Sequence, residues 1–239
     1  MQDFTSLLES SAHAHGHLCP GQVVGVRMAM LGCRLIDLDE PTSHNQIKKL
    51  IVYIEMDRCT ADAVAHVTGV KLGRRSLKFM DYGIMAATFV NLESEKAFRV
   101  VSTEEARELA CYFAPEILGK HAQQLAAYKR MPDNVLFRVQ QVKVAINEYD
   151  MPGPTRHKAT CIQCGQMVRD HREVLKDGRA FCRPCAEKAY FSDAREIHRP
   201  DMNWAAEQST RNIYLDHLKL KQSNEIESIS RKKIYRINQ

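Results

Sequence analysis

Four cysteines in the last third of the chain have the spacing of a metal site. Cys161 and Cys164 form one pair, Cys182 and Cys185 form a second, and 17 residues separate the pairs. Two residues between paired cysteines allow both sulfurs to reach one ion at about 2.3 Å. Four thiolates leave no position for water, so we expect one structural zinc ion per chain. The alternative interpretation is two CxxC redox pairs.

The residues around these pairs fit a small zinc-dependent fold. Gly165 allows the backbone to turn below the first pair, and residues 176–179 have the sequence of a hairpin turn. We therefore expect two short strands within 167–182, followed by a helix that opens at Pro184. This order predicts a treble-clef zinc finger, whose small core depends on about 10–16 kcal/mol from zinc binding. The nearby His157 and His171 are interpreted as surface histidines.

A second group with metal-binding chemistry lies near the start of the chain. His13, His15, His17 and Cys19 fall within seven residues, and Gly16 interrupts them. Zinc accepts both imidazole and thiolate, and a flexible Gly16 would allow His15 and His17 to approach one centre. Spacing alone leaves an alternative open, which is a polar loop with one buried thiol.

Four further residues carry thiol or carboxylate groups. Cys59 and Asp62 lie at the start of a predicted helix, where spacing alone favours a buried thiol and a helix cap. Cys33 and Cys111 fall on apolar faces of predicted helices, so we expect them in the core.

The elements that position the first group are predicted from hydrophobic spacing. A short helix is expected over residues 3–14, and a second should open at Pro20. Cys19 then lies at a helix N-terminus, where free N–H groups favour a thiolate. A buried strand over 50–56 and a short helix ending near residue 68 should follow.

The remaining pattern predicts an α+β fold in which an antiparallel sheet packs with helices. Further strands are expected at 78–82, 85–91, 98–101 and 135–146, with helices at 102–114 and 115–129 between them. The Pro/Gly-rich residues 151–155 mark a boundary. The expected divisions are a core domain (1–150), a four-cysteine zinc finger (156–199), and a C-terminal helix with a basic tail (200–239).

Composition and charge narrow the environment and the partners. None of the 239 residues belongs to a run of about 20 apolar residues, and no secretory leader is evident, so we expect a cytoplasmic protein with free thiols and no membrane partner. Residues 1–150 hold 17 Lys/Arg against 18 Asp/Glu, whereas residues 151–239 hold 17 against 11. An acidic partner such as nucleic acid would suit the basic part, although a solvated surface also explains it.

Residues 15–28 and 55–89 resemble the signature of the FmdE family of formylmethanofuran dehydrogenase proteins. The first stretch reads His-Gly-His-Leu-Cys-Pro-Gly and continues to Gly25-Val26-Arg27-Met28; the second runs from Glu55 through Cys59 and Asp62 to Phe89. The resemblance implies an α+β core, an intertwined homodimer, and a cleft that binds a metal or cofactor. The matching residues are His15, His17, Cys19, Cys59 and Asp62. Val70 departs from the pattern, since many members have a cysteine there.

The leading hypothesis is therefore a metal-binding protein related to FmdE, with a second metal ion or a cofactor in the core cleft. The resemblance also implies association with a molybdenum or tungsten enzyme complex, with the zinc finger mediating contacts. One alternative is a transcriptional regulator or metal sensor that binds nucleic acid or protein through its basic finger. Another is a thiol or metal-dependent enzyme that uses Cys19 or Cys59 beside His17.

Overall fold

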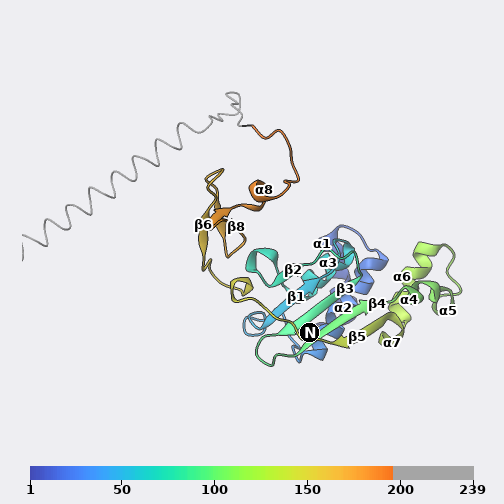
Figure 1. Cartoon of the computed structure of the whole chain (residues 1–239). Coiled ribbons are helices and arrows are strands. Elements are labelled where there is room, and N and C mark those ends of the chain that lie inside the picture. Colours follow the sequence, from blue (N-terminus) through green and yellow to red (C-terminus); the bar gives the residue numbers. More distant parts are fainter. Residues whose placement is uncertain (196–239) are drawn as a thin grey trace, which may run out of the picture.

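The computed structural model describes residues 1–195. The expected helix and basic tail at 200–239, and the end of the 156–199 division, lie outside the described residues. Figure 1 shows a helix-and-sheet body formed by the earlier elements and a group of small strands formed by the later ones. The α+β fold class is confirmed. No helix in the described part of the chain is long and apolar enough to cross a membrane.

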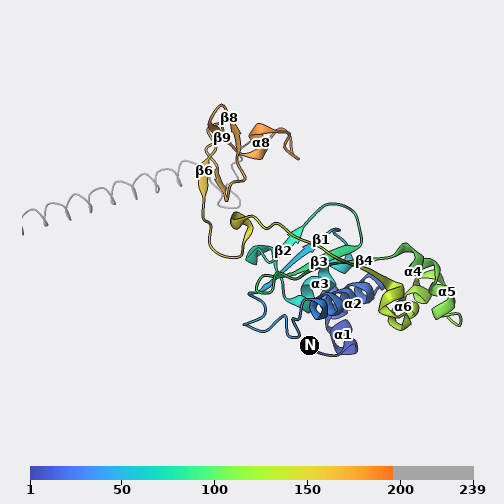
Figure 2. The same cartoon turned by 60° about the horizontal axis from the view of Figure 1, so that its bottom comes forward.

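Three helices lie on one face of the central sheet, as Figure 2 shows. They are α1 (Phe4–His15), α2 (Pro20–Leu35) and α3 (Cys59–Thr68). Asp3 caps α1 by accepting a hydrogen bond from the Ser6 N–H, and Gly16 ends it in a left-handed conformation at φ 95°. Pro20 opens α2 as predicted, with Cys19 as its N-cap. The first helix pair and its cysteine are thus placed by local sequence signals.

The sheet has five strands in the order β2-β1-β3-β4-β5. Their bounds are Leu50–Ile54 (β1), Leu77–Phe79 (β2), Ala86–Asn91 (β3), Ala97–Ser102 (β4) and Phe137–Gln141 (β5). The purely antiparallel sheet that we expected is wrong in one pair, because β1 and β2 run parallel. Helix α3 and the 3-10 turn η1 (Leu72–Arg74) supply the crossover connection that a parallel pair needs.

Short helices lie beyond the β4 end of the sheet. They are α4 (Glu104–Glu108), α5 (Ala110–Phe113), α6 (Lys120–Arg130) and α7 (Asp133–Leu136). Thr103, one residue after the expected cap, accepts the N–H of Ala106 and starts α4. Cys111 is exposed, so its predicted place in the core is wrong, whereas Cys33 is buried as expected. Arg27 ties α2 to this region by donating to the carbonyls of Tyr128 and Met131 at 2.7 and 2.6 Å.

The two faces of the sheet have different covers. Alternate residues of β1, namely Leu50, Val52 and Ile54, join the main core beneath the helices. Ile51, between them, belongs to a smaller cluster. Residues 142–146, which we expected to continue the last strand, instead leave the sheet and pack on this second face.

The later elements form two small hairpin sheets. The bounds are η2 (Glu148–Asp150), β6 (Lys158–Thr160), β7 (Met167–Arg169), β8 (Val174–Lys176), β9 (Arg179–Phe181) and α8 (Arg183–Ala186). Strand β6 pairs with β7, and β8 pairs with β9 through the predicted turn at Asp177 and Gly178, both with positive φ. The single hairpin expected over 167–182 is therefore wrong, since β7 pairs backwards with β6. We call residues 156–191 the cysteine module.

Candidate metal sites

The four-cysteine cluster has the dimensions of a tetrahedral zinc shell. The sulfurs of Cys161, Cys164, Cys182 and Cys185 all lie within 4.8 Å of one another. The Cys164 and Cys182 sulfurs are 3.7 Å apart. Sulfurs at about 2.3 Å from one zinc ion stand about 3.8 Å apart in a tetrahedron. The four residues therefore fit the zinc ion that their spacing predicts.

Backbone geometry turns each cysteine pair toward the same centre. Gly165, with φ +72°, donates its N–H to the Cys161 carbonyl at 2.9 Å. Cys185 donates its N–H to the Cys182 carbonyl at 3.1 Å in the first turn of α8. The backbone N–H of Cys182 lowers the pKa of the Cys161 thiol to about 6. A hydrogen bond with Cys182 raises the pKa of the Cys185 thiol to about 12. A divalent cation would replace the protons that such a cluster holds.

A second group joins the end of α1 to the start of α2. One ligand atom each from His15, His17 and Cys19 lies within 4.8 Å of the others. The two imidazole rings are 4.7 Å apart between centroids. Since Gly16 ends α1 between the histidines, its left-handed turn brings the second imidazole back to the first. His13, in the same sequence run, is exposed and outside the group.

Asp62 contacts this group through His15. Its carboxylate Oδ2 lies 2.9 Å from His15 Nδ1. The other ring nitrogen, Nε2, is buried and has no hydrogen-bond partner among the described residues. A carboxylate that holds one imidazole nitrogen and leaves the other free is the usual arrangement behind a metal-binding histidine. The residues present thus fit a metal ion, with Asp62 orienting a ligand.

Cys59 lies next to this group but outside it. A side-chain carbon added to Gly21 would meet Cys59 Cβ at 3.0 Å and Cys19 Sγ at 3.7 Å, so the two cysteines flank one glycine. Burial, and then a hydrogen bond with the Cys19 thiol, raise the pKa of Cys59. The structure therefore brings all five family-matched residues together, with His15, His17 and Cys19 at the centre.

A buried polar network that sequence reasoning missed fixes the three helices around this group. Gln22 is fully buried in α2 and donates its Nε2 to the Cys59 carbonyl at 2.7 Å. Its Oε1 accepts a hydrogen bond of 2.5 Å from the Ser11 hydroxyl of α1. A glutamine on the apolar face of α2, beside Val23, was the available signal, because buried amides need specific partners.

A cleft of about 540 Å³ opens beside the group. His15, Cys59 and Asp62 form part of its wall, and Leu72, Leu77 and Phe79 form an apolar part. A concave apolar surface with a few polar groups is typical of small-molecule sites.

An α+β core with a histidine and cysteine cluster, followed by a four-cysteine module, defines the chain as a metal-binding protein. The sequence profile described as FmdE, molybdenum formylmethanofuran dehydrogenase operon, matches residues 14–145. The chain belongs to this FmdE family. The profile of the prokaryotic DksA/TraR C4-type zinc finger matches residues 153–191 and includes all four cysteines.

Two individual proteins add to this assignment. A probable S-adenosyl-L-methionine-binding protein of Archaeoglobus fulgidus is 28% identical over 216 residues, which cover 82% of this chain and 57% of that relative. The chain thus spans little more than half the length of the curated relative. A crystal structure of a tungsten formylmethanofuran dehydrogenase FmdE-like protein from Syntrophus aciditrophicus matches with a TM-score of 0.53 and 17% identity. The match covers 80% of this chain and 95% of that one, which supports the fold.

Proposed function

We propose that the core of this protein holds one transition-metal ion, with zinc as the first candidate, through His15, His17 and Cys19. The observation that carries the proposal is the state of His15, whose Nδ1 is held by Asp62 at 2.9 Å while its Nε2 is buried and unpartnered among the described residues. A buried polar atom without a partner is costly, and a bound cation would satisfy it.

The neighbouring cleft supports a ligand-binding role for this ion. His15 belongs both to the metal-ligating group and to the wall of the cleft of about 540 Å³. Three protein ligands leave one position of a tetrahedral ion free, and a bound ion would supply Lewis acidity there. We propose that a small molecule occupies the cleft. The name of the Archaeoglobus relative makes S-adenosyl-L-methionine the first compound to test by calorimetry.

Metal content of matched histidine variants tests the core site. The His15→Ala variant should contain about one metal equivalent per chain fewer than the wild type, because it removes the central ligand. His13→Ala is the matched control, since His13 lies on the same helix but is exposed and outside the group. Equal metal content in wild type, His13→Ala and His15→Ala would refute the core site.

We propose that the cysteine module binds structural zinc and serves association. The two cysteine pairs, their hairpins and the short helix α8 support the treble-clef arrangement, and the linker at 151–155 supports a division into a core (1–150) and a zinc finger (156–199). A cytoplasmic location and association with a molybdenum or tungsten enzyme remain predictions that rest on the family.

The homodimer that the resemblance implies has a candidate surface. Strand β2 is an edge of the sheet, and the large apolar side chains exposed on it or beside it are Leu72, Phe79, Tyr82 and Ile84. Exposed apolar groups at a strand edge favour association. Tyr82→Glu should therefore shift the mass measured by light scattering from dimer to monomer, whereas Tyr112→Glu, exposed at α5, should not. A monomeric wild type would exclude the dimer.

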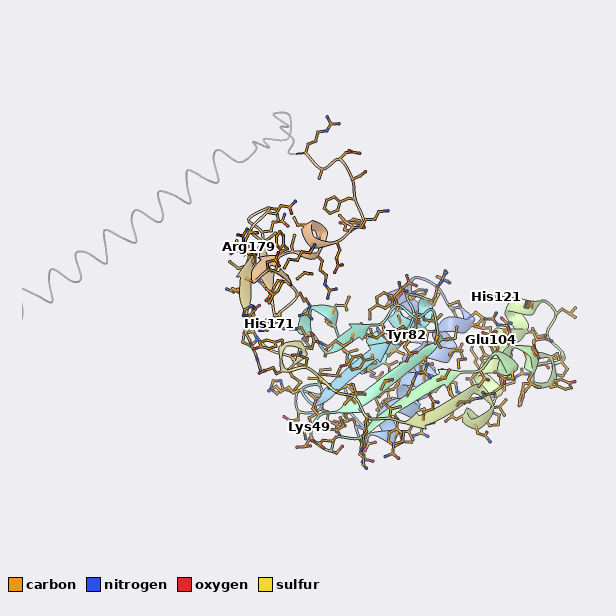
Figure 3. All side chains as sticks on the ribbon, viewed as in Figure 1. Lys49, Tyr82, Glu104, His121, His171 and Arg179 are labelled. Atoms are coloured by element: carbon orange, nitrogen blue, oxygen red, sulfur yellow. The ribbon has the colours of Figure 1, made fainter. Side chains whose placement is uncertain are left out.

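The regulator hypothesis rests on the exposed basic side chains of the cysteine module. They are Arg156, Lys158, Arg169, Lys176, Arg179, Arg183 and Lys188. Arg179, labelled in Figure 3, lies in the module on β9. This alternative predicts binding to nucleic acid that weakens steeply with salt. The thiol-enzyme alternative has less support, because the raised pKa of Cys59 disfavours its thiolate.

A further inference from the structure

A third group of metal-ligating side chains lies in the cysteine module, separate from its four cysteines. His157 precedes β6, and His171 and Glu173 lie between β7 and β8. One ligand atom from each lies within 4.8 Å of the others. His157 Nε2 is 2.9 Å from Glu173 Oε1, and His171 Nδ1 is 3.1 Å from the same oxygen. These two histidines, which the sequence suggested were independent surface residues, converge on one carboxylate.

The Glu173 carboxylate is buried and only half satisfied. Its side chain is 6% exposed, and its second oxygen, Oε2, is buried with no hydrogen-bond partner among the residues that the structure describes. The backbone N–H of Glu173 itself, together with the two imidazoles, holds the pKa of this carboxyl below its usual range. A buried carboxylate needs a positive partner, since desolvation of an unpaired charge is costly.

The histidines are poorly arranged to supply that charge as a protonated pair. Their rings stack with centroids 3.7 Å apart and planes inclined by 10°. Two imidazolium ions in such contact would repel each other, so at most one proton is readily accommodated. Ligands at about 2.0–2.1 Å from one ion stand about 2.9–3.4 Å apart, which matches the two measured nitrogen–oxygen separations.

The orphaned buried atoms reinforce this interpretation. Within residues 1–195, two buried side-chain nitrogen or oxygen atoms lack a hydrogen-bond partner, and they are His15 Nε2 and Glu173 Oε2. Each belongs to a group of three ligands with compatible spacing. The second orphan therefore repeats, with different ligands, the signal that carries the core site.

The chain holds His171 in this position through a turn that is joined to the core. Asp170 and His171 both have positive φ, 57° and 56°. The Asp170 carboxylate accepts the Arg156 N–H at 2.9 Å and Arg75 Nη1, from the core, at 2.8 Å. Tyr149 packs edge-on against the His171 ring at 4.2 Å. Figure 3 shows His171 at the end of the module that lies toward the core.

We propose that His157, His171 and Glu173 bind a divalent transition-metal ion, with zinc as the first candidate, independently of the four-cysteine site and of the core site. Two imidazole nitrogens and one carboxylate oxygen form a common zinc ligand set that leaves one position for water or an external ligand. A bound ion would link the segment before β6 to the turn before β8 beside the core.

Zinc titration of the full-length protein tests this site. Protein dialysed against a weak chelator, so that the four-cysteine ion stays bound, is titrated with zinc by calorimetry and analysed for metal. Glu173→Gln and His171→Ala should each bind about one zinc equivalent fewer than the wild type. Glu173→Gln keeps the shape and removes the charge, so it does not depend on a tolerated cavity. His121→Ala, at an exposed histidine of α6, is the control.

Two results would overturn the proposal. Unchanged zinc stoichiometry in Glu173→Gln would do so, as would a wild-type protein that binds no zinc beyond the ions lost in four-cysteine and His15 variants. The loss expected in His171→Ala does not depend on the core site, because the two groups share no ligand. Failure of the core site alone is recognised by an effect of Glu173→Gln without any effect of His15→Ala.

Discussion

Asp62 Oδ2 lies 2.9 Å from His15 Nδ1 and so joins the first turn of α3 to the last turn of α1. Although the two residues are 47 positions apart in sequence, this contact sets the orientation of the imidazole whose other nitrogen is unpartnered within the described chain. The proposed core site depends on this orientation.

Loss of the Asp62 carboxylate should weaken metal binding without removing a ligand. Asp62→Asn is expected to lower the affinity of the core site for zinc by about 10–100-fold, because the carboxylate orients His15 and strengthens it as a donor. Competition with a chromogenic chelator measures this affinity. Asp57→Asn, at another carboxylate of the cleft wall, should leave the affinity unchanged. An equal loss in both variants would mean that general negative charge, and not orientation of His15, is responsible.

Close packing of α2 on α3 should make Gly25 intolerant of a side chain. A Cβ there would lie 2.6 Å from Ala63 Cβ and 2.7 Å from the Thr60 carbonyl oxygen. Gly25→Ala should lower the free energy of unfolding by about 1–3 kcal/mol through overpacking, despite the better helix propensity of alanine. Urea denaturation checks this value. Gly73→Ala, where the added carbon meets nothing within 4 Å, should have a much smaller effect.

A two-point ion pair crosses the sheet between Glu55 and Arg99. Arg99 Nε and Nη2 each donate to one Glu55 carboxylate oxygen at 2.7 Å, and the Glu55 side chain is 6% exposed. Arg99→Met should destabilise the fold by about 3 kcal/mol, because it leaves a buried carboxylate without its cation. Arg138→Met removes an exposed pair with Glu105 and should cost less than about 1 kcal/mol. Similar unfolding midpoints for the two variants would contradict this ranking.

Removal of zinc from the four cysteines should unfold the cysteine module and spare the core. Zinc contributes about 10–16 kcal/mol to folding of such small modules. After strong chelation, proteolysis is expected to cut within 156–191 while a fragment close to residues 1–150 persists. Cys164→Ser should show the same cleavage with zinc present, whereas Cys111→Ser, at an exposed cysteine outside the cluster, should not. A module that stays resistant after metal loss would show that it folds without zinc.

Local features of both candidate sites could be predicted from the sequence, and long-range contacts could not. The spacing of Cys161 and Cys164, and the place of Cys19 before Pro20, report short segments whose geometry depends on few residues. The contact of Asp62 with His15 joins distant segments, and only the family resemblance brought these residues together. Neither spacing nor resemblance predicted the Glu55–Arg99 pair or the role of Gln22.

Errors in the predicted fold have similar causes. Hydrophobic alternation carries no strand direction, so the parallel pairing of β1 and β2 was missed. Alternation also continues through 142–146, where the apolar residues pack on the second face of the sheet without pairing in it. His157, His171 and Glu173 converge because β7 pairs with β6, a register that the expected hairpin over 167–182 did not contain.

Anomalous X-ray scattering at the zinc edge, from crystals of protein purified without chelator, tests the central claim most directly. The four-cysteine cluster provides an internal reference for occupancy. The account predicts a second peak within bonding distance of His15 Nε2, a nitrogen of His17 and Cys19 Sγ, at about 2.0–2.3 Å. A strong peak at the four cysteines, with none at these three residues even after soaking with zinc, would contradict the claim that the core binds a metal ion.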